Sequence, residues 1–107
     1  MSRRPKAGGL RFRRPHAQVF AALGDETRLS LVGRLGRGEA HSISELSKGS
    51  RLTRQAITKH LRVLQDVNVV HSVRRGRNKL FTLTPEPIEE ARKYLELVSR
   101  QRGQVRR

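Results

Sequence analysis

Apolar residues recur at helical spacing twice near the start of the chain. Val19, Phe20 and Leu23 share one helical face, and Gly24 ends that pattern. Asp25 then offers an N-cap side chain for a second helix. The apolar stripe of this second helix consists of Leu29, Val32 and Leu35, with Leu31 beside them, and it ends at Gly36. Two consecutive amphipathic helices are therefore predicted.

Two further helices follow, separated by a short turn. Ser42 and Glu45 have the spacing of a capping box, which predicts a short third helix. Thr53 caps a fourth helix, and Leu52 and Ile57 have the spacing of a hydrophobic staple across its first turn. The apolar stripe of the fourth helix is Ile57, Leu61 and Leu64, and its opposite face carries Arg54, Gln55, Thr58, Lys59 and Arg62. We expect the stripe to be buried and the opposite face to be a polar surface.

The second half of the chain changes to a strand pattern and then returns to a helical one. Segments 69–74 and 79–83 read as strands around a basic tip, where Gly76 and Asn78 are expected to supply positive φ angles. A last helix follows Pro87 and runs to about Arg100. Its apolar stripe is Ile88, Ala91, Leu95 and Val98, with Tyr94 and Leu97 beside it. The predicted fold is mainly α with a small β-hairpin, in the order ααααββα.

This order has a known use in nucleic-acid recognition. A helix, a short turn and a second helix, followed by a two-stranded hairpin, form a winged helix-turn-helix. The fourth helix would enter the major groove of a duplex, and the hairpin would lie beside it, toward the minor groove or the backbone.

Composition limits the remaining possibilities. A chain of 107 residues forms one domain, and its 35% apolar and 4% aromatic residues support a modest core, which a partner subunit could supplement. The chain contains no cysteine, which excludes disulfides, thiolate zinc sites and cysteine nucleophiles. No apolar run reaches the length of a membrane span and no secretory signal is present, so we expect a cytoplasmic protein without a membrane partner.

The net charge of +15 is unevenly distributed. Residues 1–14 carry six basic and no acidic groups, and residues 100–107 carry four basic and none. Residues 48–79 hold nine basic residues, and Asp66 is the one acidic residue among them. Such concentration is typical of a polyanion binder. We interpret 1–14 as a basic disordered arm, 15–101 as the winged helix-turn-helix DNA-binding domain, to which the resemblance described next adds dimerisation, and 102–107 as a basic tail.

The residues themselves resemble the ArsR/SmtB family of bacterial winged-helix repressors. The resemblance covers about residues 16–99. It rests on the segments Val19-Phe-Ala-Ala-Leu-Gly-Asp-Glu-Thr-Arg28-Leu, Thr53-Arg-Gln-Ala-Ile-Thr-Lys-His60-Leu-Arg-Val-Leu64 and Arg74-Arg-Gly-Arg77. It implies a homodimer joined mainly by the first and last helices. The residues that would form this interface are Phe20, Leu23, Ile88, Leu95 and Val98.

The resemblance also implies how the dimer would bind double-stranded DNA. Two recognition helices related by a dyad would read an inverted-repeat operator. Gln55, Thr58 and Lys59 are the candidates for base contacts, because glutamine can bond adenine in two places and lysine can reach guanine. The candidates for phosphate contacts are Arg54, His60 and Arg62 from the recognition helix and Arg75, Arg77 and Lys79 from the wing, with Arg77 suited to a narrow minor groove.

Many relatives release DNA when a metal binds, but this chain departs from their ligand patterns. The third helix has no cysteine, and residues 87–100 contain no histidine. His16, His41, His60 and His71 lie in four different predicted elements. We therefore expect no metal site and no cofactor. A repressor of this kind, with its own gene among the candidate targets, would be controlled by its own abundance or by a regulatory protein partner.

Two other classes of function were weighed. An enzyme is disfavoured because no nucleophile elbow or phosphate-binding loop is present, so no catalytic residue is assigned. A nonspecific architectural nucleic-acid-binding protein of the nucleoid stays open, because the charge of +15 would suit it. Preference for one duplex sequence over a scrambled one would separate the two DNA-binding hypotheses.

Overall fold

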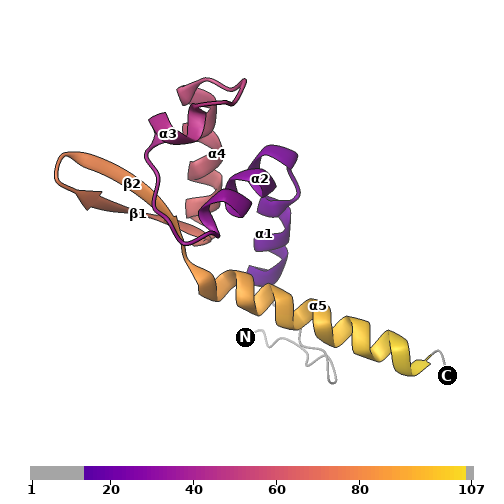
Figure 1. Ribbon diagram of the computed structural model, residues 1–107. Coiled ribbons are helices and arrows are strands. Elements are labelled where there is room, and N and C mark those ends of the chain that lie inside the picture. Colours follow the sequence, from indigo (N-terminus) through magenta and orange to yellow (C-terminus); the bar gives the residue numbers. More distant parts are fainter. Residues whose placement is uncertain (1–13, 106–107) are drawn as a thin grey trace, which may run out of the picture.

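Five helices and one β-hairpin make up the described part of the chain. The computed structural model describes residues 14–105, and the side chains of residues 16–101. The elements are α1 (Arg14–Leu23), α2 (Glu26–Leu35), α3 (Ile43–Ser47), α4 (Arg54–Asp66), β1 (Val70–Arg75), β2 (Asn78–Leu83) and α5 (Pro85–Val105). Helices α1 to α4 form the body, from which the hairpin and the outer half of α5 project on opposite sides (Figure 1). The predicted order of elements and the winged helix-turn-helix architecture are confirmed.

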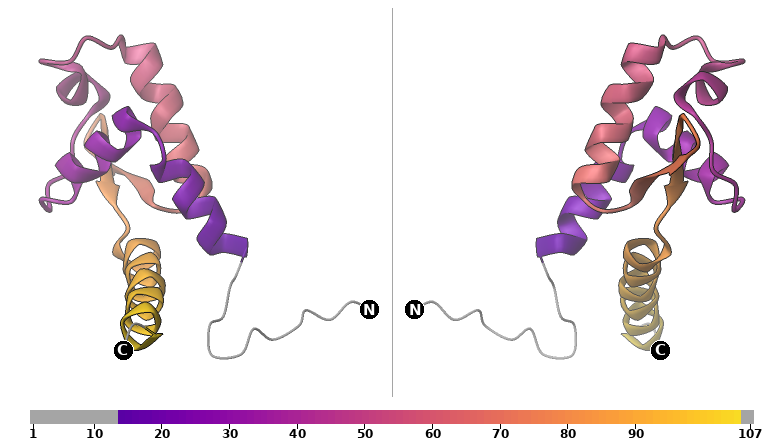
Figure 2. Two further views of the ribbon diagram at one scale, coloured as in Figure 1. Left: turned by 90° about the vertical axis from the view of Figure 1, so that its right-hand side faces the viewer. Right: turned by 90° about the vertical axis from the view of Figure 1, so that its left-hand side faces the viewer.

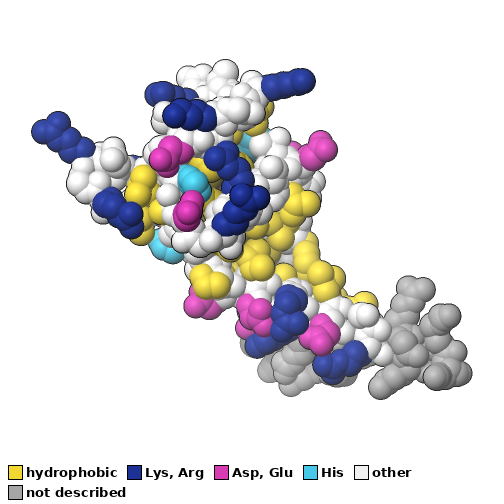
Figure 3. Space-filling view, viewed as in Figure 1, with side chains coloured by type: hydrophobic (Ala, Val, Ile, Leu, Met, Phe, Trp, Pro, Cys, Tyr) yellow, Lys and Arg dark blue, Asp and Glu magenta, His cyan; other side chains and the backbone are white. Residues whose placement is uncertain are grey.

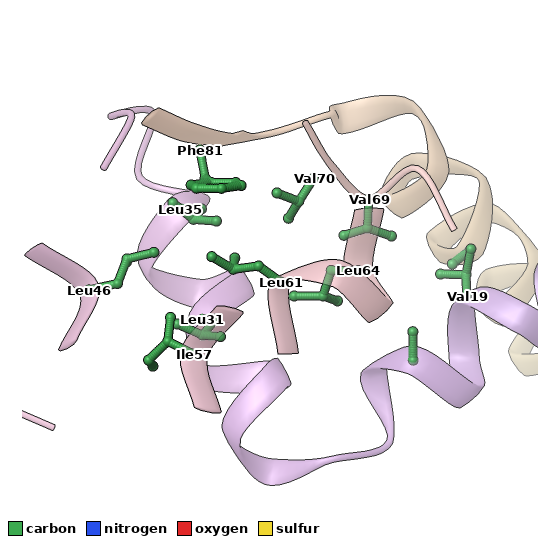
Figure 4. Close-up of a cluster of buried hydrophobic side chains, with 12 residues drawn as sticks. Val19, Leu31, Leu35, Leu46, Ile57, Leu61, Leu64, Val69, Val70 and Phe81 are labelled. Atoms are coloured by element: carbon green, nitrogen blue, oxygen red, sulfur yellow. The ribbon is translucent and has the colours of Figure 1, made fainter. Parts of the chain in front are cut away.

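The core is aliphatic except for Phe81 and centres on α4 (Figure 4). The three stripe residues predicted for this helix, Ile57, Leu61 and Leu64, are 1%, 1% and 0% exposed. They pack with buried side chains from every other element, namely Val19, Ala22, Leu31, Leu35, Leu46, Val69, Val70, Phe81 and Ala91. Helix α4 is therefore held on one whole face, and its opposite face can only point outward.

The predicted N-caps are confirmed. The Asp25 carboxylate accepts from the backbone N–H of Arg28 at 3.0 Å, and the Thr53 hydroxyl accepts from that of Ala56 at 3.1 Å. Ser42 and Glu45 form both halves of the capping box before α3. These caps satisfy amides that have no partner inside the helix, and they fix where α2, α3 and α4 begin.

The stripe predicted for α2 is partly wrong. Leu29 is 55% exposed, whereas Leu31 and Leu35 are 4% and 0% exposed. Residues 31 and 35 are four apart and share the face that meets the core, while residue 29 is about 200° of helical rotation away from residue 31. Leucines recur on both sides of this helix, so spacing alone did not identify the inner side.

The hairpin is tighter than predicted, and the role assigned to Asn78 is wrong. Arg75 pairs with Asn78 in the antiparallel register, so Gly76 and Arg77 form a two-residue loop. Only Gly76 has a positive φ there, at 64°, as in a type II′ turn. The asparagine with a positive φ is Asn68, at 62°, directly after α4.

Asn68 ends α4 and turns the chain into β1. Its backbone N–H donates to the backbone carbonyl oxygen of Gln65 at 2.9 Å, and the backbone N–H of Val69 donates to that of Leu64 at 3.0 Å. These two bonds form the pattern of a Schellman motif. Val69 and Leu64 are both fully buried, as the accompanying apolar contact of this motif requires. The first strand therefore leaves the recognition helix at a fixed angle.

The ends of the folded region differ from the predicted ones. Helix α1 begins at Arg14, so it takes in the last residue of the predicted arm, and residues 1–13 lie outside the described residues. Helix α5 continues to Val105, past the end predicted near Arg100 and into the predicted tail 102–107. Along α5, Arg92 pairs with Glu89 at 2.7 Å and with Glu96 at 3.1 Å. Pairs at these helical spacings favour continuation of the helix.

The long last helix makes the molecule extended. The radius of gyration is 16.8 Å, compared with about 13 Å for a compact chain of this length. Viewed along its axis, α5 lies below the body formed by α1 to α4 (Figure 2). Its outer half lies beyond the other described elements.

Candidate nucleic-acid interface

The short helix α3 is held beside α4 by contacts with α2, with the core and within its own capping box. Arg34 of α2 donates to the backbone carbonyl oxygens of Leu46 at 3.1 Å and Glu45 at 3.4 Å. Leu46 is 1% exposed and belongs to the core. The backbone N–H of Ser42 donates to the Glu45 carboxylate at 2.9 Å and holds the pKa of this group below its ordinary value. A five-residue helix is thereby fixed at both ends.

The face of α4 opposite the core carries the predicted DNA-contacting residues. Arg54, Gln55, Lys59 and Arg62 are exposed, and Thr58 between them is partly exposed. Because the same helix buries Ile57, Leu61 and Leu64, this face cannot turn inward without opening the core. The structure thus brings five of the six residues named on this helix onto one surface.

Two of these residues have partners within the protein. Arg54 donates through Nη2 to the Ser44 hydroxyl at 3.1 Å, which links the start of α4 to α3. The Thr58 hydroxyl donates to the backbone carbonyl oxygen of Arg54 at 2.8 Å, within α4. Both bonds restrict the side chains on the exposed face before any ligand is present.

His60 is the residue of α4 that the structure does not bring to this face. Its side chain is 22% exposed, and its Nδ1 lies 3.3 Å from Nη1 of Arg28 and 3.8 Å from the Asp25 carboxylate. Arg28 also donates through Nε to the carbonyl oxygen of Ala22 at 2.6 Å. The backbone N–H of Arg28 lowers the pKa of Asp25, and the charges of Arg28 and His60 contribute. His60 therefore links α4 to the turn between α1 and α2 and to the start of α2.

The wing residues Arg75, Arg77 and Lys79 are exposed around the hairpin tip. The Lys79 ammonium lies 5.6 Å from the centre of the Phe81 ring, so this side chain folds back along β2. Phe81 and His41 exchange two backbone bonds, of 2.9 and 2.7 Å, which attach the base of the wing to the segment before α3. The position of the wing relative to the helix-turn-helix is therefore fixed by backbone bonds at its base.

The distribution of charge follows this arrangement. Lys and Arg project from the hairpin and from the α3–α4 end of the molecule, whereas acidic and basic side chains alternate along α5 (Figure 3). The same view shows an apolar band that passes from α1 onto α5. The basic surface and the apolar band lie on different parts of the molecule.

The five residues predicted for a dimer interface fall into two groups. Phe20, Leu23 and Ile88 are partly buried and pack against the core of the same chain. The Phe20 ring lies 6.1 Å from the Tyr94 ring, centre to centre. Leu95 and Val98 are 54% and 37% exposed. Folding of one chain thus covers the inner part of the predicted interface and leaves its outer part open.

Sequence reasoning missed the residues that position the site. Arg34 and Arg28 reach partners 6 to 32 residues away, and Ser44 meets Arg54 across the turn. No local spacing marks such contacts. The described residues contain no cluster of three or more His, Cys, Asp or Glu side chains that could hold a metal ion. Among the described helices, none is both long and apolar enough to span a membrane.

Comparisons with known proteins agree with this geometry. A family described as "Helix-turn-helix domain" matches residues 23–73. The HTH-type transcriptional regulator YuzN of Bacillus subtilis is 35% identical over 77 residues, covering 66% of this chain and 84% of YuzN. A transcriptional repressor SmtB homolog of Synechocystis is 33% identical over 67 residues, covering 63% of this chain and 50% of that protein.

A solved structure extends the agreement to the fold. An ArsR-like transcriptional regulator from Rhodococcus superposes with a TM-score of 0.74 and 36% identity, covering 84% of each chain. These proteins are transcriptional regulators rather than enzymes. This chain therefore belongs to the ArsR/SmtB family of transcriptional regulators, which have a DNA-binding helix-turn-helix.

Proposed function

We propose that this regulator is a homodimeric repressor that binds an inverted-repeat operator and needs no metal inducer. The observation that carries the proposal is the pair of faces on α4. One face is fully buried, and the other presents arginine, lysine and glutamine side chains beside a basic wing. Glutamine and lysine can read base edges in the major groove, and the wing arginines can bind phosphates.

The proposed dimer is supported by the part of α5 whose apolar side chains are exposed. Leu95 and Val98 lie one turn apart on the stripe that begins with the partly buried Ile88 and the buried Ala91. An apolar stripe that continues past the body of one chain is best covered by the same stripe of a second chain, since a twofold interface is self-complementary. We propose that Phe20 and Tyr94 flank this contact and that residues 15–101 act as one DNA-binding and dimerisation unit.

Metal independence is supported by the ligand inventory. The chain has no cysteine, and residues 87–100 contain no histidine, so the third and last helices lack the ligands that metal-responsive relatives use there.

Repression is supported by the SmtB homolog, which is named a transcriptional repressor. A DNA-binding regulator acts where the chromosome lies, so we propose the bacterial nucleoid as its site of action, with control by its own abundance or by a regulatory protein partner.

The test is the fluorescence anisotropy of a labelled duplex from the gene's own upstream region against a scrambled duplex. The titrations are run over a salt series, with and without zinc. We expect the native duplex to bind at least ~10³-fold more tightly at physiological salt and to be insensitive to zinc. Equal binding of both duplexes would instead support an architectural protein, which the charge of +15 would also suit.

A further inference from the structure

The hydroxyl of Thr58 is already used within its own helix. It donates to the backbone carbonyl oxygen of Arg54 at 2.8 Å, one turn earlier in α4. A hydroxyl has one proton, so it cannot donate to a base while this bond is kept. This bond to a carbonyl one turn earlier is common for threonine inside helices. What the side chain can still offer outward is its methyl group and the lone pairs of its oxygen.

The position of Thr58 makes its methyl group useful. The exposed Arg54, Gln55 and Arg62 lie three or four residues from Thr58, are its neighbours on the helix surface and carry hydrogen-bonding groups. The methyl group of Thr58 is therefore an apolar group among polar side chains. In the major groove, thymine alone presents a methyl group at the base edge.

We propose that Thr58 recognises a thymine in each operator half-site by contact between its methyl group and the thymine 5-methyl group. The proposal rests on the proposed function, because it requires α4 to enter the major groove. It assigns to Thr58 a role in specificity that needs no hydrogen bond to the base.

The expected size of the effect follows from the loss of one buried methyl group. Its removal lowers affinity about fourfold at one half-site, and about fifteenfold when both half-sites of a dimer are changed. This is small compared with the whole preference for an operator, but it is confined to one base-pair position.

The experiment starts from a duplex selected by the wild-type protein from a random-sequence pool. Each thymine is replaced by deoxyuridine, which removes the methyl group alone, at symmetric positions in both half-sites. Wild type, Thr58→Ser and Thr58→Val are compared by anisotropy, and circular dichroism checks that the variants are folded. Serine lacks the methyl group, whereas valine keeps it and lacks the oxygen.

We expect one symmetric pair of thymines at which deoxyuridine weakens binding of wild type and Thr58→Val about fifteenfold. At that pair Thr58→Ser should be insensitive, and it should bind the parent duplex as weakly as wild type binds the substituted one. Sensitivity that persists in Thr58→Ser, or a loss in Thr58→Val as large as in Thr58→Ser, would overturn the proposal.

The design separates failure of this inference from failure of the proposed function. A duplex that is selected and bound specifically, yet shows no sensitive thymine, overturns the role of Thr58 alone. A pool from which no sequence is enriched overturns base readout as a whole, and the role of Thr58 with it.

Discussion

Helices α4 and α5 have similar sequence patterns but are used differently. The stripe of α4 is covered completely within one chain, with Leu61 1% exposed. The stripe of α5 is covered at Ile88 and Ala91 and becomes exposed at Leu95, which is 54% exposed. The difference shows that an apolar stripe alone does not say which molecule covers it. In α4 the other face is exposed and polar, whereas in α5 the outer part of the stripe itself is exposed, and we propose that a second chain covers it.

The largest effect should come from placing a charge on the open stripe of α5. Leu95→Glu puts a carboxylate where the second chain is expected, and desolvating it there is costly. We expect monomers in sedimentation velocity, and operator affinity lowered by roughly 10² to 10⁴, the gain that joining two binding modules provides.

The matched control for this variant is Lys93→Gln. It changes the net charge by the same amount on the exposed opposite side of α5. This control should stay dimeric. A sedimentation profile unchanged in Leu95→Glu would rule out the proposed interface.

The next effect sharpens the contrast between buried and exposed leucines. Leu61→Ala removes a fully buried side chain from the centre of the core and should lower the free energy of unfolding by about 2 to 5 kcal/mol. Leu29→Ala makes the same chemical change at an exposed position of α2 and should cost less than about 0.5 kcal/mol. Urea unfolding followed by circular dichroism measures both, and equal losses would contradict the assignment of Leu61 to the core and of Leu29 to the surface.

A smaller effect should separate the recognition helix from the wing. Gln55→Ala should lower the preference for operator over scrambled duplex by about 1 to 3 kcal/mol. Arg75→Ala should weaken both duplexes alike and reduce the slope of log affinity against log salt by about one unit. Anisotropy titrations of both variants over a salt series test this. If both variants lowered preference equally, the division between base and phosphate contacts would be wrong.

The smallest effect concerns the capping box before α3. The pKa of Glu45 is lowered from its ordinary 4.5 by the backbone N–H of Ser42, so ionised Glu45 stabilises the fold above about that pH. This contribution is lost as the pH falls through the lower folded-state pKa. Wild type should melt at a higher temperature than Glu45→Gln at pH 7, and the difference should disappear in acid.

Ser42→Ala is the control for this titration. It removes the hydroxyl acceptor from the same capping box but keeps the backbone N–H that bonds Glu45. It should therefore melt below wild type at every pH. A difference between wild type and Glu45→Gln that did not change with pH would refute the role of the ionised carboxylate.

Local signals in the sequence predicted most of the fold. Asp25, Ser42 and Thr53 were identified as caps because their bonds reach three residues along the chain. The buried stripe of α4 was identified because its other face is mainly polar, with Val63 as a single large apolar residue that is 37% exposed. In α2, by contrast, Leu29 and Leu31 lie on opposite sides, and sequence alone did not show which side faced the core.

The arrangement of the site was less predictable. The bond between Arg54 and Ser44 and the approach of Arg28 to His60 join residues 10 and 32 positions apart. Such contacts depend on how the helices pack, which spacing does not encode. The surface of α4 could thus be predicted as a set of residues, but the orientation of His60 away from it could not.

In the proposed complex, two α4 helices, joined through α5, read two half-sites of one operator. Hydroxyl-radical footprinting on a duplex selected from a random pool tests it most directly. We expect two protected segments on one face of the duplex, centred about 34 Å apart, which is one helical turn. Continuous protection that spreads along any duplex with increasing protein would contradict it and indicate a nonspecific, phosphate-driven binder.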